Sequence, residues 1–218
     1  WRLHGAALGL REGALETHRA ALREFARERF DSLRPSYPFA NDEIAHATRE
    51  ELCDQLEKFL LLDWDRGTRR EFVDVERAFG FDSPCVLESA AGPLHVRGKI
   101  DRMDRESSVL VLRDLKTGTG KPRRADDPPD ARTDLQLALY ARVARVMAPQ
   151  WKTPERVRVA YVYTRRGAPE RGWAGADFEQ LDAATDAWLA TAVEVLQQGA
   201  FVRSPDDEDC RFCAYGAV

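Results

Sequence analysis

The feature that most constrains the fold is a change in the hydrophobic period near residue 70. Before it, apolar residues recur at helical spacing, which predicts one helix over 6–30 and a second from Asn41, a favourable N-cap residue, to Leu62. After it, apolar and polar residues alternate, which is the period of a β-strand. A chain that switches in this way is expected to pack helices against a sheet.

Three strands are predicted in succession, over 72–79, 94–103 and 108–115. The short link between the second and third favours a hairpin. A Gly-, Pro- and charge-rich stretch follows over 117–130, and it is not typical of regular structure. The remainder predicts a helix, a strand and a helix, over 134–147, 157–164 and 178–198.

This order of elements predicts an α/β fold with a central mixed β-sheet flanked by helices. We expect one domain over 1–200, followed by a cysteine-bearing tail over 201–218. With 218 residues, 44% apolar and 32% charged, the chain has the composition of a globular domain. No apolar run approaches the roughly 20 residues of a membrane span, so no membrane association is expected.

The start of the chain, Trp1-Arg2-Leu3-His4, has no signal-peptide pattern and no initiating Met. We therefore expect a cytoplasmic protein and interpret the chain as a fragment of a longer one. The formal net charge of −4 disfavours a general nucleic-acid binder. Net charge is a poor guide where a site is built from carboxylates, and basic residues do cluster, at Arg97, Lys99, Arg102, Arg105, Lys116, Lys121, Arg123 and Arg124.

The third predicted strand carries an unusual pair of charges. Asp114 and Lys116 share one face with Leu110 and Leu112, where core residues are expected, and Asp101 would lie opposite Asp114 across the hairpin. Two converging carboxylates repel each other unless a cation lies between them, and hard oxygen ligands suit Mg²⁺ or Mn²⁺. A neighbouring lysine can orient water or neutralise charge on a phosphoryl group. The alternative is an edge strand with solvated charges, because Asp-x-Lys alone is common.

Three segments in this order decide between these interpretations. They are Val96-Arg97-Gly98-Lys99-Ile100-Asp101-Arg102-Met103-Asp104, Arg113-Asp114-Leu115-Lys116-Thr117-Gly118 and Gln136-Leu137-Ala138-Leu139-Tyr140-Ala141. Together they resemble the RecB-like branch of the PD-(D/E)xK nuclease superfamily, whose pattern is G-x-I-D-R-x-D, D-x-K-T-G and Q-L-x-x-Y. The resemblance covers roughly 75–218, and it implies a restriction-endonuclease-like core.

The resemblance implies a metal-dependent deoxyribonuclease that uses Mg²⁺ or Mn²⁺. Asp101 and Asp114 would bind the metal, the Leu115 carbonyl would complete its shell, and Lys116 would be the catalytic lysine. Asp101, Asp114 and Lys116 are therefore the predicted catalytic residues.

Four further positions are candidates. Glu76 matches a glutamate on the family's first strand, as a ligand or support, with a surface carboxylate as the alternative. His18 is the nearest match to the family's helix histidine, with His4 as a rival and an exposed helix histidine as the alternative. Gln136 and Tyr140 would contact the DNA strand, and the alternative is that their helix simply packs on the sheet with Tyr140 as a half-buried anchor.

The tail contains Cys210-Arg211-Phe212-Cys213, a spacing that lets two thiolates reach one metal. It resembles the C-terminus of AddB-type nucleases, where one upstream and three downstream cysteines hold an iron–sulfur cluster. We expect a 4Fe-4S cluster in the full-length protein and none in this fragment, which lacks two ligands. Cys53 or Cys85 could substitute, but both are expected to be ordinary thiols.

The favoured function is a RecB/AddB-type DNA nuclease in end processing, repair or recombination. It would act as an exonuclease more than an endonuclease, on single-stranded ends supplied by a helicase domain or subunit. A CRISPR-associated RecB-like adaptation nuclease is the nearest alternative. A catalytically silent DNA-binding scaffold is the alternative of another class, and the presence of Asp101, Asp114 and Lys116 disfavours it. No helix-turn-helix or zinc-finger spacing supports a transcription-factor-like binder.

Overall fold

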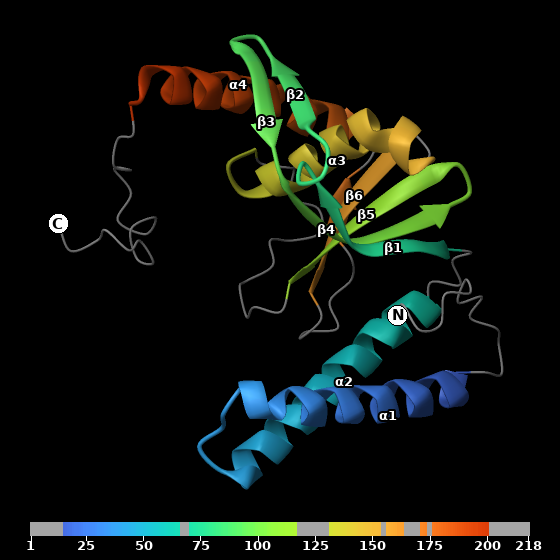
Figure 1. The fold of residues 1–218 in the computed structure, drawn as a ribbon. Helices are drawn as coiled ribbons and strands as arrows, with labels where there is room; N and C mark the ends of the chain where they lie inside the picture. Colours follow the sequence, from blue (N-terminus) through green and yellow to red (C-terminus); the bar gives the residue numbers. More distant parts are fainter. Residues whose placement is uncertain are drawn as a thin grey trace.

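The computed structural model describes residues 15–65, 70–116, 131–153, 156–163, 171–173 and 176–200. Two helices precede a run of strands, and two further helices follow with two short strands between them (Figure 1). The elements are α1 (Leu15–Leu33), η2 (Arg34–Ser36), α2 (Asp42–Asp65), β1 (Arg70–Phe79), β2 (Cys85–Ser89), β3 (Gly92–Val96), β4 (Gly98–Glu106), β5 (Val109–Lys116), α3 (Ala131–Trp151), β6 (Val157–Tyr163), β7 (Arg171–Trp173) and α4 (Ala176–Gln198).

The central sheet has five strands in the order β1-β4-β5-β6-β7. The pairs β1–β4, β4–β5 and β6–β7 are antiparallel, whereas β5–β6 is parallel. The sheet is therefore mixed, and the predicted α/β fold class is confirmed. β5 lies in the middle, so it is covered on both faces, and residues 110–114 are all buried.

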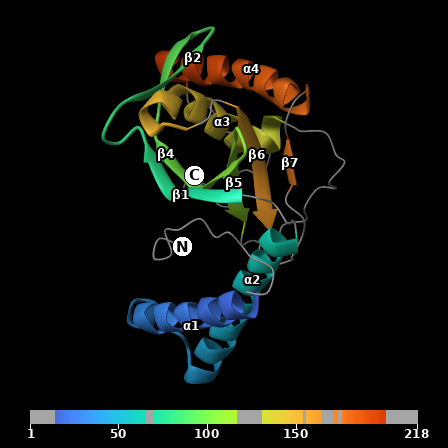
Figure 2. The same ribbon diagram turned by 90° about the vertical axis from the view of Figure 1, so that its right-hand side faces the viewer.

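Helix α3 covers one face of the sheet and α4 packs on the outer side of α3, while α1 and α2 lie on the other side of the sheet (Figures 1 and 2). The core under α3 joins Leu110 and Leu112 of β5 to Leu137 and Ala141 of the helix. The hairpin β2–β3 forms a separate sheet against α3 and α4. Since strand side chains alternate, the even-numbered residues of β5 face this core.

The opposite face of β4 and β5 buries charge instead. Asp104 has no exposed surface. Its Oδ1 and Oδ2 accept hydrogen bonds from Nε of Arg102 at 3.0 and 2.9 Å, and its Oδ2 accepts a third from Arg113 at 3.2 Å. Both guanidinium groups lie over the Phe59 ring of α2, at 5.3 and 4.9 Å from its centroid. The pair Asp104 and Arg102 of the resemblance motif therefore joins the sheet to α2.

Helix α2 starts as predicted. The backbone N–H of Ile44 donates to Oδ1 of Asn41 at 2.8 Å, which satisfies one of the orphan donors of the first turn. The predicted N-cap is confirmed.

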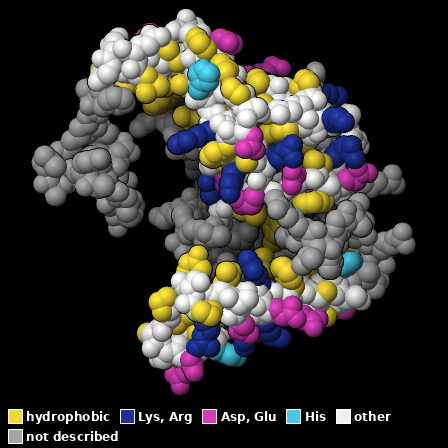
Figure 3. All heavy atoms as spheres, in the orientation of Figure 1, with side chains coloured by type: hydrophobic (Ala, Val, Ile, Leu, Met, Phe, Trp, Pro, Cys, Tyr) yellow, Lys and Arg dark blue, Asp and Glu magenta, His cyan; other side chains and the backbone are white. Residues whose placement is uncertain are grey.

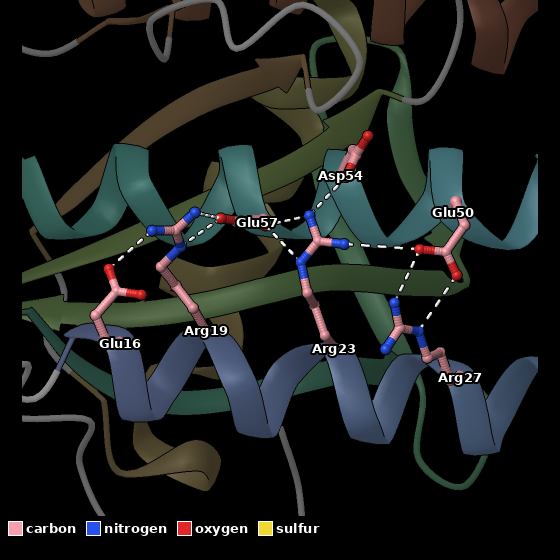
Figure 4. Close-up of polar contacts among 7 residues, drawn as sticks. All are labelled: Glu16, Arg19, Arg23, Arg27, Glu50, Asp54 and Glu57. Atoms are coloured by element: carbon pink, nitrogen blue, oxygen red, sulfur yellow. Dashed lines mark hydrogen bonds and ion pairs between the residues drawn. The ribbon is translucent and has the colours of Figure 1, made fainter.

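Helix α1 has no buried residue, and ion pairs hold one of its edges to α2. Arg23 pairs with Asp54 at 2.6 Å and Arg27 with Glu50 at 2.9 Å, while Arg19 reaches Glu57 and Glu16 (Figure 4). Arg23 also pairs with Glu57. We call these seven residues the ion-pair ladder.

Two strand predictions needed correction. The predicted strand over 94–103 divides into β3 and β4, which belong to different sheets. A Cβ at Gly98 would come within 2.9 Å of Cζ of Phe79, so this glycine makes room for the aromatic ring where β4 starts. Cys85, predicted in a loop, begins the unpredicted strand β2.

Residues 6–14, the start of the first predicted helix, lie outside the described residues, as do 117–130 and the tail over 201–218. In the described part of the chain, no helix combines the length and apolar character that crossing a membrane requires.

Candidate active site

The two central carboxylates lie on neighbouring strands. Arg102 of β4 pairs with Arg113 of β5, so the next positions along the two strands are Asp101 and Asp114. The backbone N–H of Leu115 donates to Oδ2 of Asp101 at 2.9 Å. This bond fixes the Asp101 carboxylate against the end of β5.

Asp114 is only 2% exposed although it is an aspartate. Its Oδ2 lies 2.6 Å from Nζ of Lys116, an ion pair without the geometry of a hydrogen bond to that oxygen. Burial raises the pKa of the Asp114 carboxyl, the contact and charge of Lys116 lower it, and the charge of Asp101 raises it. The net shift is upward, so this carboxylate carries a desolvation cost that a nearby cation relieves.

Lys116 is oriented by groups from three elements. Besides Asp114 on its own strand, its Nζ donates to Oε1 of Gln136 on α3 at 2.9 Å. The Tyr161 ring of β6 lies 5.1 Å below Nζ, at cation–π distance. The ammonium group is therefore held in one place at the end of β5.

Gln136 and Tyr140 extend this contact along α3. Nε2 of Gln136 donates to the Tyr140 hydroxyl at 2.8 Å, and the two residues are one helical turn apart. Burial raises the pKa of Tyr140, the Gln136 bond lowers it, and the charges of Asp114, Asp101 and Glu76 raise it further. The hydroxyl therefore stays protonated among three carboxylates.

Glu76 lies on β1 between Val75 and Arg77, which pair with Arg102 and Ile100 of β4. Register thus places it beside Asp101. Its φ of 49° is left-handed, which is uncommon for a residue with a side chain. Its side chain is 59% exposed and lies 3.6 Å from Nζ of Lys99. A solvated ion pair is what the structure shows at this position.

His18 lies on α1, and its ring faces Trp64 of α2 with 6.4 Å between centroids. Among the described residues, no group of three or more His, Cys, Asp and Glu side chains is arranged to hold a metal ion. His18 is therefore not brought together with Asp101 and Asp114.

The donor set nevertheless fits Mg²⁺ or Mn²⁺. Mg²⁺ is commonly held by only one or two carboxylates, with water and substrate phosphate completing its shell. Asp101 and Asp114 supply two adjacent carboxylates, and the buried Oδ2 of Asp114 accepts no hydrogen bond within the described part of the chain. Both features are those of a site built to receive a cation.

One contributor to the site was not predicted from the sequence. Tyr161 is the register partner of Asp114 across the parallel pair β5–β6, and strand alternation in the Val157–Tyr163 segment was the available signal. Lys99, which alternation places on one strand face with Asp101, pairs with Glu76.

Cys53 and Cys85 are both buried, and burial raises the pKa of each thiol. They are protonated thiols inside packed structure, which is the role predicted for them. Cys210 and Cys213 lie outside the described residues.

The mixed sheet with helices on both sides, and two carboxylates and a lysine at the end of its central strands, define a restriction-endonuclease-like α/β protein. Comparison with known families gives the same answer: the profile of the PD-(D/E)XK nuclease superfamily matches residues 2–218. This chain belongs to the PD-(D/E)XK nuclease superfamily, which implies a metal-dependent nuclease. No curated protein matches the chain.

Proposed function

We propose that the chain is a DNA nuclease of RecB/AddB type that cuts single-stranded ends in DNA repair or recombination, more as an exonuclease than as an endonuclease. The observation that carries the proposal is Asp114, a buried carboxylate beside Asp101 that forms an ion pair with Lys116. Burying a carboxylate costs desolvation free energy, and a bound cation would offset that cost. Buried carboxylates with a shifted pKa are also typical of functional sites.

Asp101 and Asp114 would hold Mg²⁺ or Mn²⁺ together with the backbone carbonyl of Leu115. A divalent ion at this place supplies Lewis acidity toward a phosphoryl oxygen. The Leu115 N–H keeps Asp101 oriented toward the end of β5, so the protein prepares the ligand before metal arrives. Glu76, one strand away, would be a support or a further ligand.

Lys116 would act on the scissile phosphate or its attacking water. Its ammonium group is held by Asp114 and Gln136, so it is positioned to neutralise charge that develops on phosphate oxygens. The Tyr140 hydroxyl accepts from Gln136 and keeps its own proton, which it can donate to a substrate oxygen. Gln136 and Tyr140 would therefore contact the DNA strand, and His18 remains a candidate metal ligand on sequence grounds alone.

The helicase association and the 4Fe-4S cluster are further parts of the proposal. Their support is the Cys-x-x-Cys spacing of Cys210 and Cys213 together with the RecB/AddB-like motifs. Two thiolates leave a cluster two ligands short of four, so two further ligands would have to complete it.

The test is cleavage of end-labelled linear single-stranded DNA with Mg²⁺ or Mn²⁺. Asp114→Asn and Lys116→Met are each expected to lower the rate at least about a hundred-fold, the scale of removing one charge-stabilising group from an active site. Asp82→Asn changes an exposed carboxylate outside the proposed site and serves as the matched control. Wild-type rates in both site variants would contradict the proposal.

A further inference from the structure

An apolar groove of about 610 Å³ lies between α1 and α2 and ends at the sheet. We call it the hairpin groove and define it by Phe25, Phe30, Tyr37, Phe39, Leu52 and Leu115. Leu115 is the residue between Asp114 and Lys116, and its N–H orients Asp101. Because strand side chains alternate, the Leu115 side chain faces the α1–α2 side of the sheet, so the groove ends behind the end of β5 that carries Asp114 and Lys116 on its other face.

The apolar side chains of this groove are unusually accessible. Phe25 is 40% exposed, Tyr37 65% and Leu52 42%. Figure 3 shows hydrophobic side chains at the surface of the α1–α2 part of the molecule, among charged ones. Clustered exposure of this kind marks a binding surface more often than a structural one.

The groove is held open by contacts that do not fill it. The ion-pair ladder ties α1 to α2 along a different edge, through Arg19, Arg23 and Arg27 (Figure 4). Phe30 and Phe39 pack on each other with 5.5 Å between centroids and fix the turn between the helices. The hairpin is thereby preformed, which lowers the entropic cost of binding.

The charges at the groove are cationic. Arg29 lines it and forms no ion pair with any carboxylate in the described part of the chain. Arg34 also lines it and pairs with Asp42, whose side chain is 92% exposed. By contrast, the three ladder arginines are each neutralised by carboxylates. Of the α1 arginines in the described part of the chain, Arg29 is the one without a carboxylate partner, and it lies beside the exposed aromatic rings.

Exposed aromatic rings with arginines beside them are the combination that binds single-stranded nucleic acid, through base stacking and phosphate contacts. In duplex DNA the faces of the bases are stacked on one another and cannot stack on protein side chains. An apolar protein segment would make no ion pairs with the arginines. We propose that the hairpin groove binds unpaired bases of the substrate strand beside the end of β5, which carries Asp114 on its other face. The inference rests on the proposed function and adds to it a subsite that selects single strands.

The experiment measures fluorescence anisotropy of a labelled oligothymidylate and of a duplex of equal length, in EDTA so that neither is cut. Tyr37→Ala and Phe25→Ala should each weaken single-strand binding roughly five- to a hundred-fold, the range for losing one base–aromatic stack. Tyr37→Phe keeps the ring and should bind like wild type. Trp188→Ala removes an equally exposed aromatic residue on α4, 46% exposed, and should change nothing.

Salt dependence tests the phosphate contact separately. Arg29→Ala should reduce the slope of log affinity against log salt by about 0.7, the contribution of one phosphate contact to a single strand. Arg105→Ala, which removes an exposed arginine paired with Glu71 on the sheet, is the control and should leave the slope unchanged.

Circular dichroism and thermal melting establish that each variant is folded. Wild-type affinity for the single strand in both Tyr37→Ala and Phe25→Ala would overturn the inference, as would an equal loss for duplex and single strand. A wild-type dimer that these variants convert to monomer would assign the groove to a second copy and also overturn it. These outcomes leave the proposed function standing if wild type cuts DNA and Asp114→Asn does not.

Discussion

Replacing Asp104 by Ala is the perturbation for which the structure gives the clearest magnitude. Asp104 is fully buried and accepts hydrogen bonds from Arg102 and Arg113, which are themselves 6% and 1% exposed. The substitution removes the carboxylate that pairs with both of these buried guanidinium groups. Breaking a buried ion pair in this way costs about 3–5 kcal/mol of unfolding free energy.

The two guanidinium groups keep their contacts with the Phe59 ring, which places the expected loss toward the lower end of that range. For a domain of this size, each kcal/mol lowers the Tm by about 2–4 °C, so Asp104→Ala should melt roughly 6–20 °C below wild type. Urea unfolding followed by circular dichroism should show a lower midpoint with an unchanged m-value.

Glu71→Ala is the matched control, because Glu71 of β1 pairs with Arg105 of β4, the strand that carries Asp104, but the side chains are 53% and 48% exposed. An exposed pair contributes at most about 1 kcal/mol. If Asp104→Ala were no more destabilising than Glu71→Ala, the buried charge network would not be what joins the sheet to α2.

Two further outcomes are expected from the N-terminal helices. Asn41→Ala should lower the unfolding free energy by about 1 kcal/mol in urea titrations, because it removes the cap on Ile44, whereas Asn41→Asp should restore most of the loss. The ion-pair ladder should weaken in acid. Burial raises the pKa of Glu57, but the hydrogen bonds from Arg23 and Arg19 lower this pKa by more, and the hydrogen bond from Arg27 lowers the pKa of Glu50. A carboxyl whose pKa is lowered in the folded state stabilises that state above the unfolded pKa of about 4.3. This stabilisation is lost as the pH falls through the folded-state pKa. Hydrogen exchange should therefore show α1 losing protection below about pH 4 before β5 does.

Local patterns made much of the fold predictable. The cap at Asn41 and the order of helices and strands depend on residues close in sequence, which the helical and strand periods report. The shared face of Asp101 and Asp114 also follows from alternation and a short hairpin.

The parts that escaped prediction depend on contacts between distant segments. The break between β3 and β4 reflects the Phe79 ring packing on Gly98, which no local pattern encodes. Tyr161 reaches Lys116 only because β6 pairs in parallel with β5 after a long crossover. The role of Asp104 was hidden for the same reason, since its burial depends on Phe59 of α2.

The central claim, that Asp101 and Asp114 hold a divalent ion at the end of β5, is tested most directly by titrating Mn²⁺ into the protein and following the electron paramagnetic resonance signal of the free ion. Wild type should bind Mn²⁺ with an affinity that falls as pH is lowered through the raised pKa of Asp114, because protons compete for the carboxylate. Asp114→Asn should abolish that binding, and Asp82→Asn should not. Mn²⁺ binding by Asp114→Asn as tight as that of wild type would contradict the account.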